Sequence, residues 1–317
     1  MQLNQRAAAS AELLIVHSHE LRAELVHVGG GRLVDMGVES RGGLSAGLEL
    51  ARICMATLGE VSLVPCPTEV GSGPAVAVHT DHPVAACLAS QYAGWRIARD
   101  KFFAMGSGPM RAAAGSEDLF DQIGFREQSD RVVGVLETSQ RPPAEVFEEL
   151  AAQCRVRVGD LTLLAARTAS QAGTLQVVAR SVETALHKLH ELGFDLARVE
   201  SGWGIAPLPP VAADDITAIG RTNDAILYGG QVVLWVRGDD ASLAEIGPRV
   251  PSSASADHGE PFASIFERYD GDFYQIDPLL FSPAVVTFVN LDTGLSQRFG
   301  RIERGVLERS FGGGGSG

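Results

Sequence analysis

The sequence predicts a mixed α/β protein with two domains, and three observations support this class. Segments with helical periodicity alternate with short apolar segments along the chain, without an internal repeat. A length of 317 residues provides sizeable cores for two ordinary domains. Apolar residues make up 45% and charged residues 21%, which is typical of globular proteins. We assign 1–150 to one α/β domain and 151–311 to another, with an approximate boundary, and allow the C-terminal strands to return to the first domain.

The first half of the chain carries signals for both element types. Helical periodicity predicts helices at residues 3–20, 43–58, 83–92 and 143–154. Runs rich in apolar and β-branched residues predict strands at 24–28, 32–38, 61–64, 75–79, 131–137 and 161–166. Glycines at 29–31 favour a turn between the first two strands, because glycine adopts the backbone angles that tight turns need. The segment 102–109, FFAMGSGP, is expected to break into a glycine loop.

The second half contains a long predicted helix, over residues 176–192. Its apolar residues recur at helical spacing and define a buried face, and they are Val178, Val182, Ala185, Leu186, Leu189 and Leu192. Strands are predicted at 198–201, 231–237, 284–290 and 296–302, and a proline-rich loop at 204–210. Residues 312–317, GGGGSG, have the composition of a flexible linker, and we leave them out of the fold prediction.

The stretch 220–230, GRTNDAILYGG, places four polar residues in a row and closes on two glycines. One interpretation is a helix start or turn, because Asn and Asp side chains bond nearby backbone N–H groups. The other is a recognition loop whose hydrogen-bonding groups all face one ligand. Local rules explain the parts of the stretch but do not require the four polar residues together.

The charge balance and the cysteines limit the function classes. Lys and Arg number 26 against 39 Asp and Glu, which gives a net charge of −13. Nucleic-acid binders neutralise phosphates with basic side chains, so this balance argues against nucleic acid and against an anionic membrane as partner. No apolar run approaches the roughly 18 residues of a membrane-spanning helix, and the N-terminus is a poor secretory signal. Four separated cysteines without a CxxC pair are typical of reduced thiols in a cytoplasmic protein.

Three short motifs invite chemical interpretations. GLSAG at 43–47 fits the pattern around a nucleophilic serine, Ser45, but only about 40 residues precede it, so a glycine-rich helix start is favoured. HTDH at 79–82 is followed by a proline, which pushes the preceding residue into an extended conformation, and no second His/Cys cluster completes a metal site. We expect Asp81 to be a pocket or capping residue there, and no metal. MGSGP at 105–109 is a weak dinucleotide fingerprint, but a loop approaching a ligand remains plausible.

Arg180 and Glu183 stand three residues apart on the predicted helix 176–192, nearly opposite its apolar face. One interpretation is an ion pair in solvent, worth a few tenths of a kcal/mol. The other is that this face lines a cleft between two domains, where partial desolvation adapts the carboxylate to acid–base work. Periodicity alone does not choose between the two interpretations.

Taken together, the chain resembles the methenyltetrahydromethanopterin cyclohydrolases over nearly its whole length before the linker. The segments that match in order are VESRGG (38–43), TDHP (80–83), FFAMGSGPMR (102–111), QVVARSVETALHKL (176–189), GIAPLPPVAADD (204–215), GRTNDAILYGG (220–230), PSSAS (251–255), GEPF (259–262), FYQIDPLLFSPA (273–284) and LERSFG (307–312). GRTNDAILYGG is the most specific of them.

The resemblance implies an activity and a site. Members of that family reversibly hydrolyse the methenyl bridge of a tetrahydromethanopterin to the N5-formyl compound in one-carbon metabolism, without a metal or other prosthetic group. Their fold has two α/β domains with the pocket in the cleft between them, and they are typically homotrimers. An Arg and a Glu three residues apart carry the chemistry, which assigns catalysis here to Arg180 and Glu183.

Binding of the pterin ring, which is rich in donors and acceptors, is assigned by hypothesis to polar residues of the matching segments. The residues are Arg221, Thr222, Asn223 and Asp224, followed at lower weight by Asp81, Gly106, Ser107 and Gly108. The alternative function is a non-catalytic pterin-binding or carrier protein on the same scaffold. The intact Arg180 and Glu183 argue against that alternative.

Overall fold

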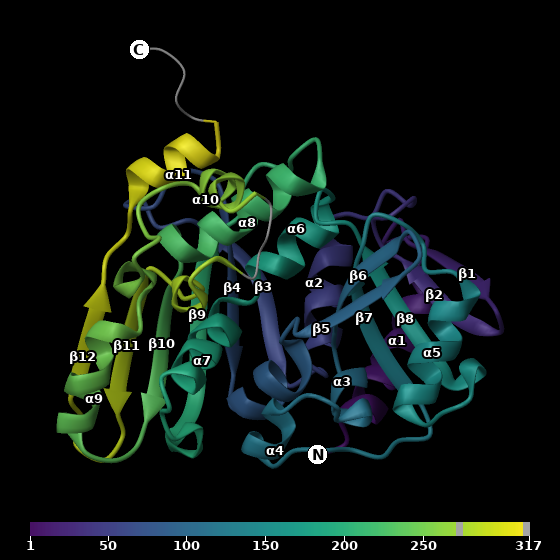
Figure 1. The fold of residues 1–317 in the computed structure, drawn as a ribbon, viewed down its shortest axis with the longest axis horizontal. Helices are drawn as coiled ribbons and strands as arrows, with labels where there is room; N and C mark the ends of the chain where they lie inside the picture. Colours follow the sequence, from purple (N-terminus) through teal and green to yellow (C-terminus); the bar gives the residue numbers. More distant parts are fainter. Residues whose placement is uncertain (271–274, 313–317) are drawn as a thin grey trace. The chain divides into compact units, whose positions relative to one another are not determined.

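The computed structural model describes residues 1–270 and 275–312, which fall into two compact units (Figure 1). Unit 1 holds residues 1–60 and 84–176, and unit 2 holds residues 61–83 and the described residues from 177 onward. Each unit contains a six-stranded sheet with helices, so the mixed α/β class is confirmed. Residues 61–83 belong to unit 2, although the predicted boundary places them in the first domain. Residues 151–176 belong to unit 1, although that boundary places them in the second domain.

The sheet of unit 1 has the strand order β1-β2-β8-β7-β6-β5. Its strands are β1 (Glu24–Val28), β2 (Gly31–Asp35), β5 (Trp95–Arg99), β6 (Phe102–Ser107), β7 (Val132–Glu137) and β8 (Leu161–Ala166). β2, β8 and β7 are parallel, and the outer strands pair antiparallel. The three parallel strands therefore end together, at Asp35, Ala166 and Glu137, and we call this the carboxyl edge of unit 1.

Helices cover both faces of this sheet. The helical elements of unit 1 are α1 (Leu3–Val16), α2 (Leu44–Cys54), the π-helix η1 (Val84–Gln91), α3 (Met110–Ala114), α4 (Leu119–Ile123), α5 (Ala144–Cys154), the 3-10 helix η2 (Val158–Asp160) and α6 (Gln171–Val178). α1 and α2 share a core with Leu164 of β8, whereas α3 and α5 share a core with Leu163. Neighbouring side chains of a strand face opposite sides of the sheet, so β8 is covered on both faces.

The sheet of unit 2 has the strand order β12-β11-β10-β9-β4-β3. Its strands are β3 (Gly59–Pro65), β4 (Pro74–Thr80), β9 (Val199–Pro207), β10 (Gln231–Val236), β11 (Val285–Asn290) and β12 (Ser296–Gly300). β10 and β11 are parallel, whereas β9 pairs antiparallel with both β4 and β10. β3 and β4 thus belong to a sheet whose other four strands come much later in the chain.

Helices of unit 2 pack in two groups. The helical elements are α7 (Ser181–Glu191), α8 (Asp215–Gly229), α9 (Asp240–Ile246), α10 (Phe262–Arg268), α11 (Arg304–Ser310) and the 3-10 helices η3 (Leu196–Arg198), η4 (Gly247–Arg249), η5 (Ser252–Ala254) and η7 (Pro278–Leu280). α7 packs on β9 and β10. α8, α10 and α11 share a core that includes Tyr228, Phe262 and Leu307.

The prediction of one helix over 176–192 is wrong. α6 and α7 are separate helices, and Arg180 between them has φ −91° and ψ 10° as the N-cap residue of α7. The first turn of α7 lies close to β9, since a Cβ atom on Gly204 would be 2.4 Å from Ser181 Oγ. The periodicity of residues 176–192 does not predict this contact with a strand that lies later in the chain. The sequence alone therefore did not predict the break.

Several predicted loops are also wrong. The 102–109 segment forms β6 as far as Ser107, because it pairs with β5 and β7. Residues 204–207 of the proline-rich loop expected at 204–210 belong to β9, which extends to Pro207. The 220–230 stretch is the second half of α8, so the recognition-loop interpretation does not apply. α8 begins earlier, where the Asp214 side chain caps it by accepting from Thr217 N.

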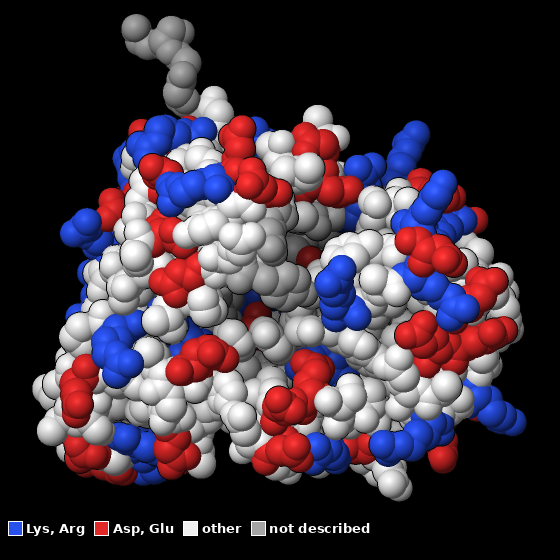
Figure 2. Space-filling model, viewed as in Figure 1, with Lys and Arg blue, Asp and Glu red and all other residues white. Residues whose placement is uncertain are grey.

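Figure 2 shows acidic and basic side chains interspersed over the face that it draws. Within residues 1–270 and 275–312, none of the helices has both the length and the apolar content of a membrane span. Residues 313–317 of the expected linker lie outside the described part of the chain, as do residues 273–274 of the matching segment 273–284.

Candidate active site

Arg180 and Glu183 lie at the amino-terminal end of α7. Arg180 is the N-cap residue, and Glu183 belongs to the first turn. Each residue is only 5% exposed. This burial excludes an ion pair in open solvent, which was one of the two interpretations of their spacing.

The position of Glu183 in the first turn of α7 favours the charged form of its carboxyl group. The first turn of a helix carries the partial positive charge of backbone N–H groups that have no intrahelical partner. Burial acts in the opposite direction, because a buried carboxylate loses its hydration. A carboxyl group under such opposed effects suits both the release and the uptake of a proton.

The polar residues of the 220–230 stretch bond within unit 2. Arg221 donates to the carbonyl oxygens of Ser310 and Pro210, from Nε over 3.3 Å and from Nη1 over 3.2 Å. Thr222 Oγ1 and Asn223 Nδ2 donate to carbonyl oxygens one turn earlier in α8, over 2.9 and 2.8 Å. Arg221 therefore ties α8 to the end of α11 and to the proline-rich segment.

Asp224 joins two helices of unit 2. It is fully buried and accepts a 2.8 Å hydrogen bond from the backbone N–H of Phe262, the first residue of α10. Burial raises the pKa of Asp224 from 3.8 to about 7, although hydrogen bonds from Ser310 and Phe262 act to lower it. The structure thus gives this predicted binding residue a place in the interior of the α8–α10–α11 group.

Asp81 lies at the exposed end of β4 and accepts a 2.7 Å hydrogen bond from Ser201 Oγ. The preceding residue in β4 pairs with Gly202 of β9. A Cβ atom on Gly202 would lie 2.6 Å from Cγ1 of Val182, in the first turn of α7. Among the predicted binding residues of unit 2, Asp81 is therefore the one that the strand register brings towards the start of α7.

Gly106, Ser107 and Gly108 belong to unit 1, where Gly106 and Ser107 end β6 and Gly108 follows it. Ser107 is fully buried and pairs with Val135 in the middle of β7. Gly108 has φ +86°, a conformation that favours glycine, and its N–H donates to the carbonyl oxygen of Ser90 over 2.8 Å. Gly106 pairs with Leu136 of β7, one residue from the carboxyl edge, and both glycines lie in close packing at this end of β6.

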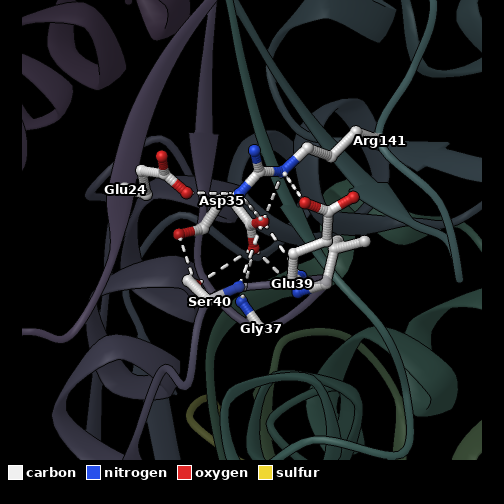
Figure 3. Close-up of polar contacts among 7 residues, drawn as sticks. Glu24, Asp35, Gly37, Glu39, Ser40 and Arg141 are labelled. Atoms are coloured by element: carbon white, nitrogen blue, oxygen red, sulfur yellow. Dashed lines mark hydrogen bonds and ion pairs between the residues drawn. The ribbon is translucent and has the colours of Figure 1, made fainter.

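Sequence reasoning missed a buried carboxylate cluster at the carboxyl edge of unit 1. Asp35 ends β2 and is fully buried. Its carboxylate accepts hydrogen bonds from the backbone N–H groups of residues 37–40 over 2.8–3.2 Å and from Arg141 Nε over 2.8 Å (Figure 3). Burial alone would raise the pKa of Asp35, but these hydrogen bonds together hold it below the ordinary value.

The same cluster connects two loops. Arg141 comes from the segment between β7 and α5, and it also pairs with Glu24 and, over 3.3 Å, with Glu39. The available signal was an aspartate followed by a glycine two residues later, since such an Asp often bonds the backbone N–H groups that follow it, but the predicted strand 32–38 ran past both residues.

A cavity of about 950 Å³ lies elsewhere on unit 1 and is lined by none of the predicted site residues. Its lining comes from the start of α1, residues 127–131 before β7, and the end of α5 with Cys154 and Arg155. Residues that precede β7 lie at the amino-terminal edge of the sheet. Ligands of open α/β sheets bind at the opposite, carboxyl edge, so we do not place the active site in this cavity.

Comparison with known proteins gives a consistent family. A family model described as Cyclohydrolase (MCH) matches residues 2–311. A methenyltetrahydromethanopterin cyclohydrolase of Rhodopirellula baltica is 47% identical over 98% of this chain and 95% of its own length. Proteins of the same name from Xanthobacter autotrophicus and Methanococcoides burtonii are 50% and 38% identical, over 89% and 98% of this chain and 83% and 98% of their own lengths.

Proposed function

The chain belongs to the methenyltetrahydromethanopterin cyclohydrolase family, and we propose that it hydrolyses the methenyl bridge of a tetrahydromethanopterin derivative to the N5-formyl compound. The observation that carries the proposal is the burial of Arg180 and Glu183 at the start of α7, at 5% exposure each. Burying two charged residues costs folding free energy, because burial removes their hydration. Such residues are therefore candidates for a functional role.

The reaction needs a base more than it needs an electrophilic catalyst. The methenyl carbon lies between two nitrogens in a cationic amidinium, so it is already activated towards attack. The carboxylate of Glu183 accepts a proton from water while the water oxygen bonds to that carbon. Glu183 then returns the proton to N10 as the bond between the carbon and N10 breaks, which leaves the formyl group on N5. The remaining proton of the added water leaves the hydroxyl group of the tetrahedral adduct for solvent as the formyl C=O bond forms, so that atoms and charge balance.

Arg180 is proposed to orient and tune Glu183. A guanidinium at the N-cap position favours the carboxylate form, so that Glu183 is available as a base when the substrate binds. The carboxylate also suits a substrate whose ground state is cationic. Neither role requires a metal or another prosthetic group, and the pterin derivative itself is the substrate.

For substrate binding in unit 2 we propose Asp81, whose strand register leads towards the start of α7. The four residues Arg221–Asp224 are proposed to act indirectly, since each has hydrogen-bond partners inside unit 2. The backbone at 106–108 is likewise proposed to support the sheet of unit 1.

We further propose that the protein is a homotrimer in the cytoplasm. The trimer rests on the family resemblance alone. The four cysteines, all within the described residues, are present as thiols, which is the state that a reducing compartment maintains.

The catalytic assignment is tested by the loss of the methenyl chromophore. The unaltered protein is expected to accelerate that loss strongly over buffer. Glu183→Gln should lower kcat by about 10³-fold with little change in KM, because the amide keeps the shape but cannot accept the proton. Glu191→Gln in the same helix and Ser45→Ala are controls that should keep near-full activity. A Glu183→Gln variant with unaltered kcat would overturn the assignment.

A further inference from the structure

The first turn of α7 lies closer to β9 than ordinary side chains on that strand would allow. A Cβ atom on Gly204 would be 2.4 Å from Ser181 Oγ, and a Cβ atom on Gly202 would be 2.6 Å from Cγ1 of Val182. Both distances are below 3.0 Å, which Cβ atoms in folded proteins essentially never show. Two glycines of the strand therefore make room for two consecutive residues of the helix start.

The backbone conformation of β9 does not require glycine at either position. Gly202 and Gly204 lie inside the strand, and neither has a positive φ. Alternate residues of a strand face the same side of the sheet, so both glycines face α7. Glycine weakens the interior of a strand and often marks the close approach of another backbone. The position of α7 thus accounts for the two glycines, whereas the strand itself does not.

The helix side of this contact holds a hydroxyl group that acts by its volume alone. Ser181 is fully buried, and among the residues that the structure describes its Oγ has no hydrogen-bond partner. Ser181 is the first residue of α7 and follows the N-cap residue Arg180 directly. Because Oγ makes no hydrogen bond, its removal leaves no other polar group unpaired. A double-mutant test at this contact therefore measures steric overlap.

We propose that Gly204 is a positioning residue for the hydrolysis reaction and that Gly202 has the same role. This inference rests on the proposed function for the roles of Arg180 and Glu183. The glycines let the first turn of α7 lie directly on β9, and this contact fixes the place of both functional side chains. A methyl group on Gly204 would have to move the first turn by about 1 Å to reach an ordinary contact distance. A misplacement of about 1 Å lowers a catalysed rate by about 10²-fold.

A purely structural role of Gly204 predicts a different outcome. If the glycine served only to pack α7 on the sheet, an added methyl group would lower stability and leave kcat of the folded protein unchanged. Gly229→Ala is the matched control for such an overlap. Its Cβ would lie 2.8 Å from Cγ of Pro207, at the end of the same strand, but it belongs to α8 and not to α7.

The first measurement is steady-state kinetics with the methenyl substrate, at a temperature where thermal unfolding shows each variant to be folded. Gly204→Ala should lower kcat by about 10–100-fold and keep KM within about threefold, because the substrate still binds whereas the reacting groups are displaced. Gly229→Ala should lower the melting temperature and keep kcat within about threefold. A kcat of Gly204→Ala within threefold of the unaltered chain would overturn the proposal.

The second measurement is the rescue of Gly204→Ala by Ser181→Ala. Without Oγ, the nearest atoms to the added methyl group are Val182 Cγ2 at 3.1 Å and the Cβ of residue 181 at 3.2 Å, which require a shift of only a few tenths of an ångström. When Ser181→Ala is already present, Gly204→Ala should therefore lower kcat by less than about threefold. Equal losses of kcat with and without Ser181→Ala would overturn the proposal.

Gly202→Ala repeats the test at the neighbouring contact, with Val182→Ala as the second change. Val182→Ala removes the Cγ1 atom that the new methyl group would meet at 2.6 Å. The loss of kcat in Gly202→Ala should again be smaller when the second change is present. This pair decides the question if Gly204→Ala does not fold, and equal losses here would then reject the inference.

The result is separable from the catalytic assignment. Loss of kcat in Glu183→Gln, together with an unaltered kcat in Gly204→Ala, would retain the proposed function and reject this inference. A loss in Gly204→Ala that Ser181→Ala rescues, together with full activity of Glu183→Gln, would retain the positioning role of the helix start and reject Glu183 as the base.

Discussion

Asp224 places a carboxyl group in the interior of unit 2, where it links α8 to α10. The sequence analysis assigned it by hypothesis to the pterin, as one of four polar residues in a matching segment, whereas the segment is helical and this side chain is buried in unit 2. The side chains of Arg221, Thr222 and Asn223 also bond to backbone carbonyls of unit 2. At the residue scale, a polar cluster in the sequence thus corresponds here to helix anchoring.

Asp224→Asn is expected to stabilise the protein at pH 8 and to have little effect at pH 4. Burial raises the pKa of Asp224 from 3.8 to about 7, so between about pH 4 and pH 7 the folded chain holds a proton that the unfolded chain has lost. The free energy of unfolding of the unaltered protein therefore falls as the pH rises through this range, and above pH 7 the loss is on the order of a few kcal/mol. Urea unfolding at both pH values measures the effect.

The exposed Asp118→Asn is the control and should show no such pH dependence. A stabilisation of Asp224→Asn that is equal at pH 4 and pH 8 would contradict the explanation. The value of kcat/KM should stay within about threefold of the unaltered chain, and a large loss would return Asp224 to the substrate-binding residues.

At the scale of elements, α7 carries a second buried charge. Lys188 is 1% exposed and donates to the carbonyl oxygen of Leu279. Burial lowers the pKa of Lys188 from 10.5 to about 8, although the charge of Asp277 acts to raise it. Lys188 thus connects the helix that carries Glu183 to the segment around η7.

Lys188→Met is expected to be more stable than the unaltered chain at pH 7, by on the order of 1–3 kcal/mol, because the protonated amine is buried. Between about pH 8 and 10.5 the unfolded chain holds a proton that the folded chain releases, so the unaltered protein gains stability as the pH rises. The difference between the two proteins should therefore shrink at pH 10 in urea unfolding. The exposed Lys101→Met serves as the control, and a difference that grows with pH would refute the argument.

Many elements could be predicted from local signals. The strands expected at 24–28, 131–137 and 161–166 are confirmed as β1, β7 and β8, because their apolar runs and flanking turns are local features. The helix break before Arg180 and strand β6 were not predictable in the same way. Both depend on contacts with residues distant in the sequence, such as Gly204 for α7 and the β7 residue Leu136, which pairs with Gly106, for β6.

At the scale of the whole molecule, the chain order differs from the spatial order. β8 lies between β2 and β7 and pairs with both, although it follows residue 150. A fragment of residues 1–150 therefore lacks the centre of its sheet. We expect it to show no cooperative urea transition by circular dichroism, since the buried strands would expose their unpaired edges.

The matched comparison joins residues 1–60 to 84–178 with a short Gly-Ser linker. This fragment contains every strand of unit 1 and is expected to unfold cooperatively. A cooperative transition in the 1–150 fragment, or none in the joined fragment, would show that unit 1 as defined here is not an independent folding unit.

The candidate site was predictable only where the family resemblance supplied roles. Arg180 and Glu183 followed from the resemblance, and their burial is a property of the folded chain that their helical spacing did not indicate. The Asp35 cluster was not predicted, because Arg141, which pairs with Asp35 and with Glu24 of β1, comes from a segment that is about 100 residues away in the sequence and that the sheet brings close. A sequence pattern does not encode which loops share a sheet edge.

The hairpin of β3 and β4 also has a consequence for synthesis on the ribosome. β4 pairs with β9, which begins about 120 residues after β4 ends. At about 5–20 residues per second, the finished hairpin waits roughly 6–24 s for its neighbour to emerge. An isolated two-stranded hairpin is only marginally stable in water, so the nascent chain exposes this apolar strand to chaperones and to other nascent chains during that interval.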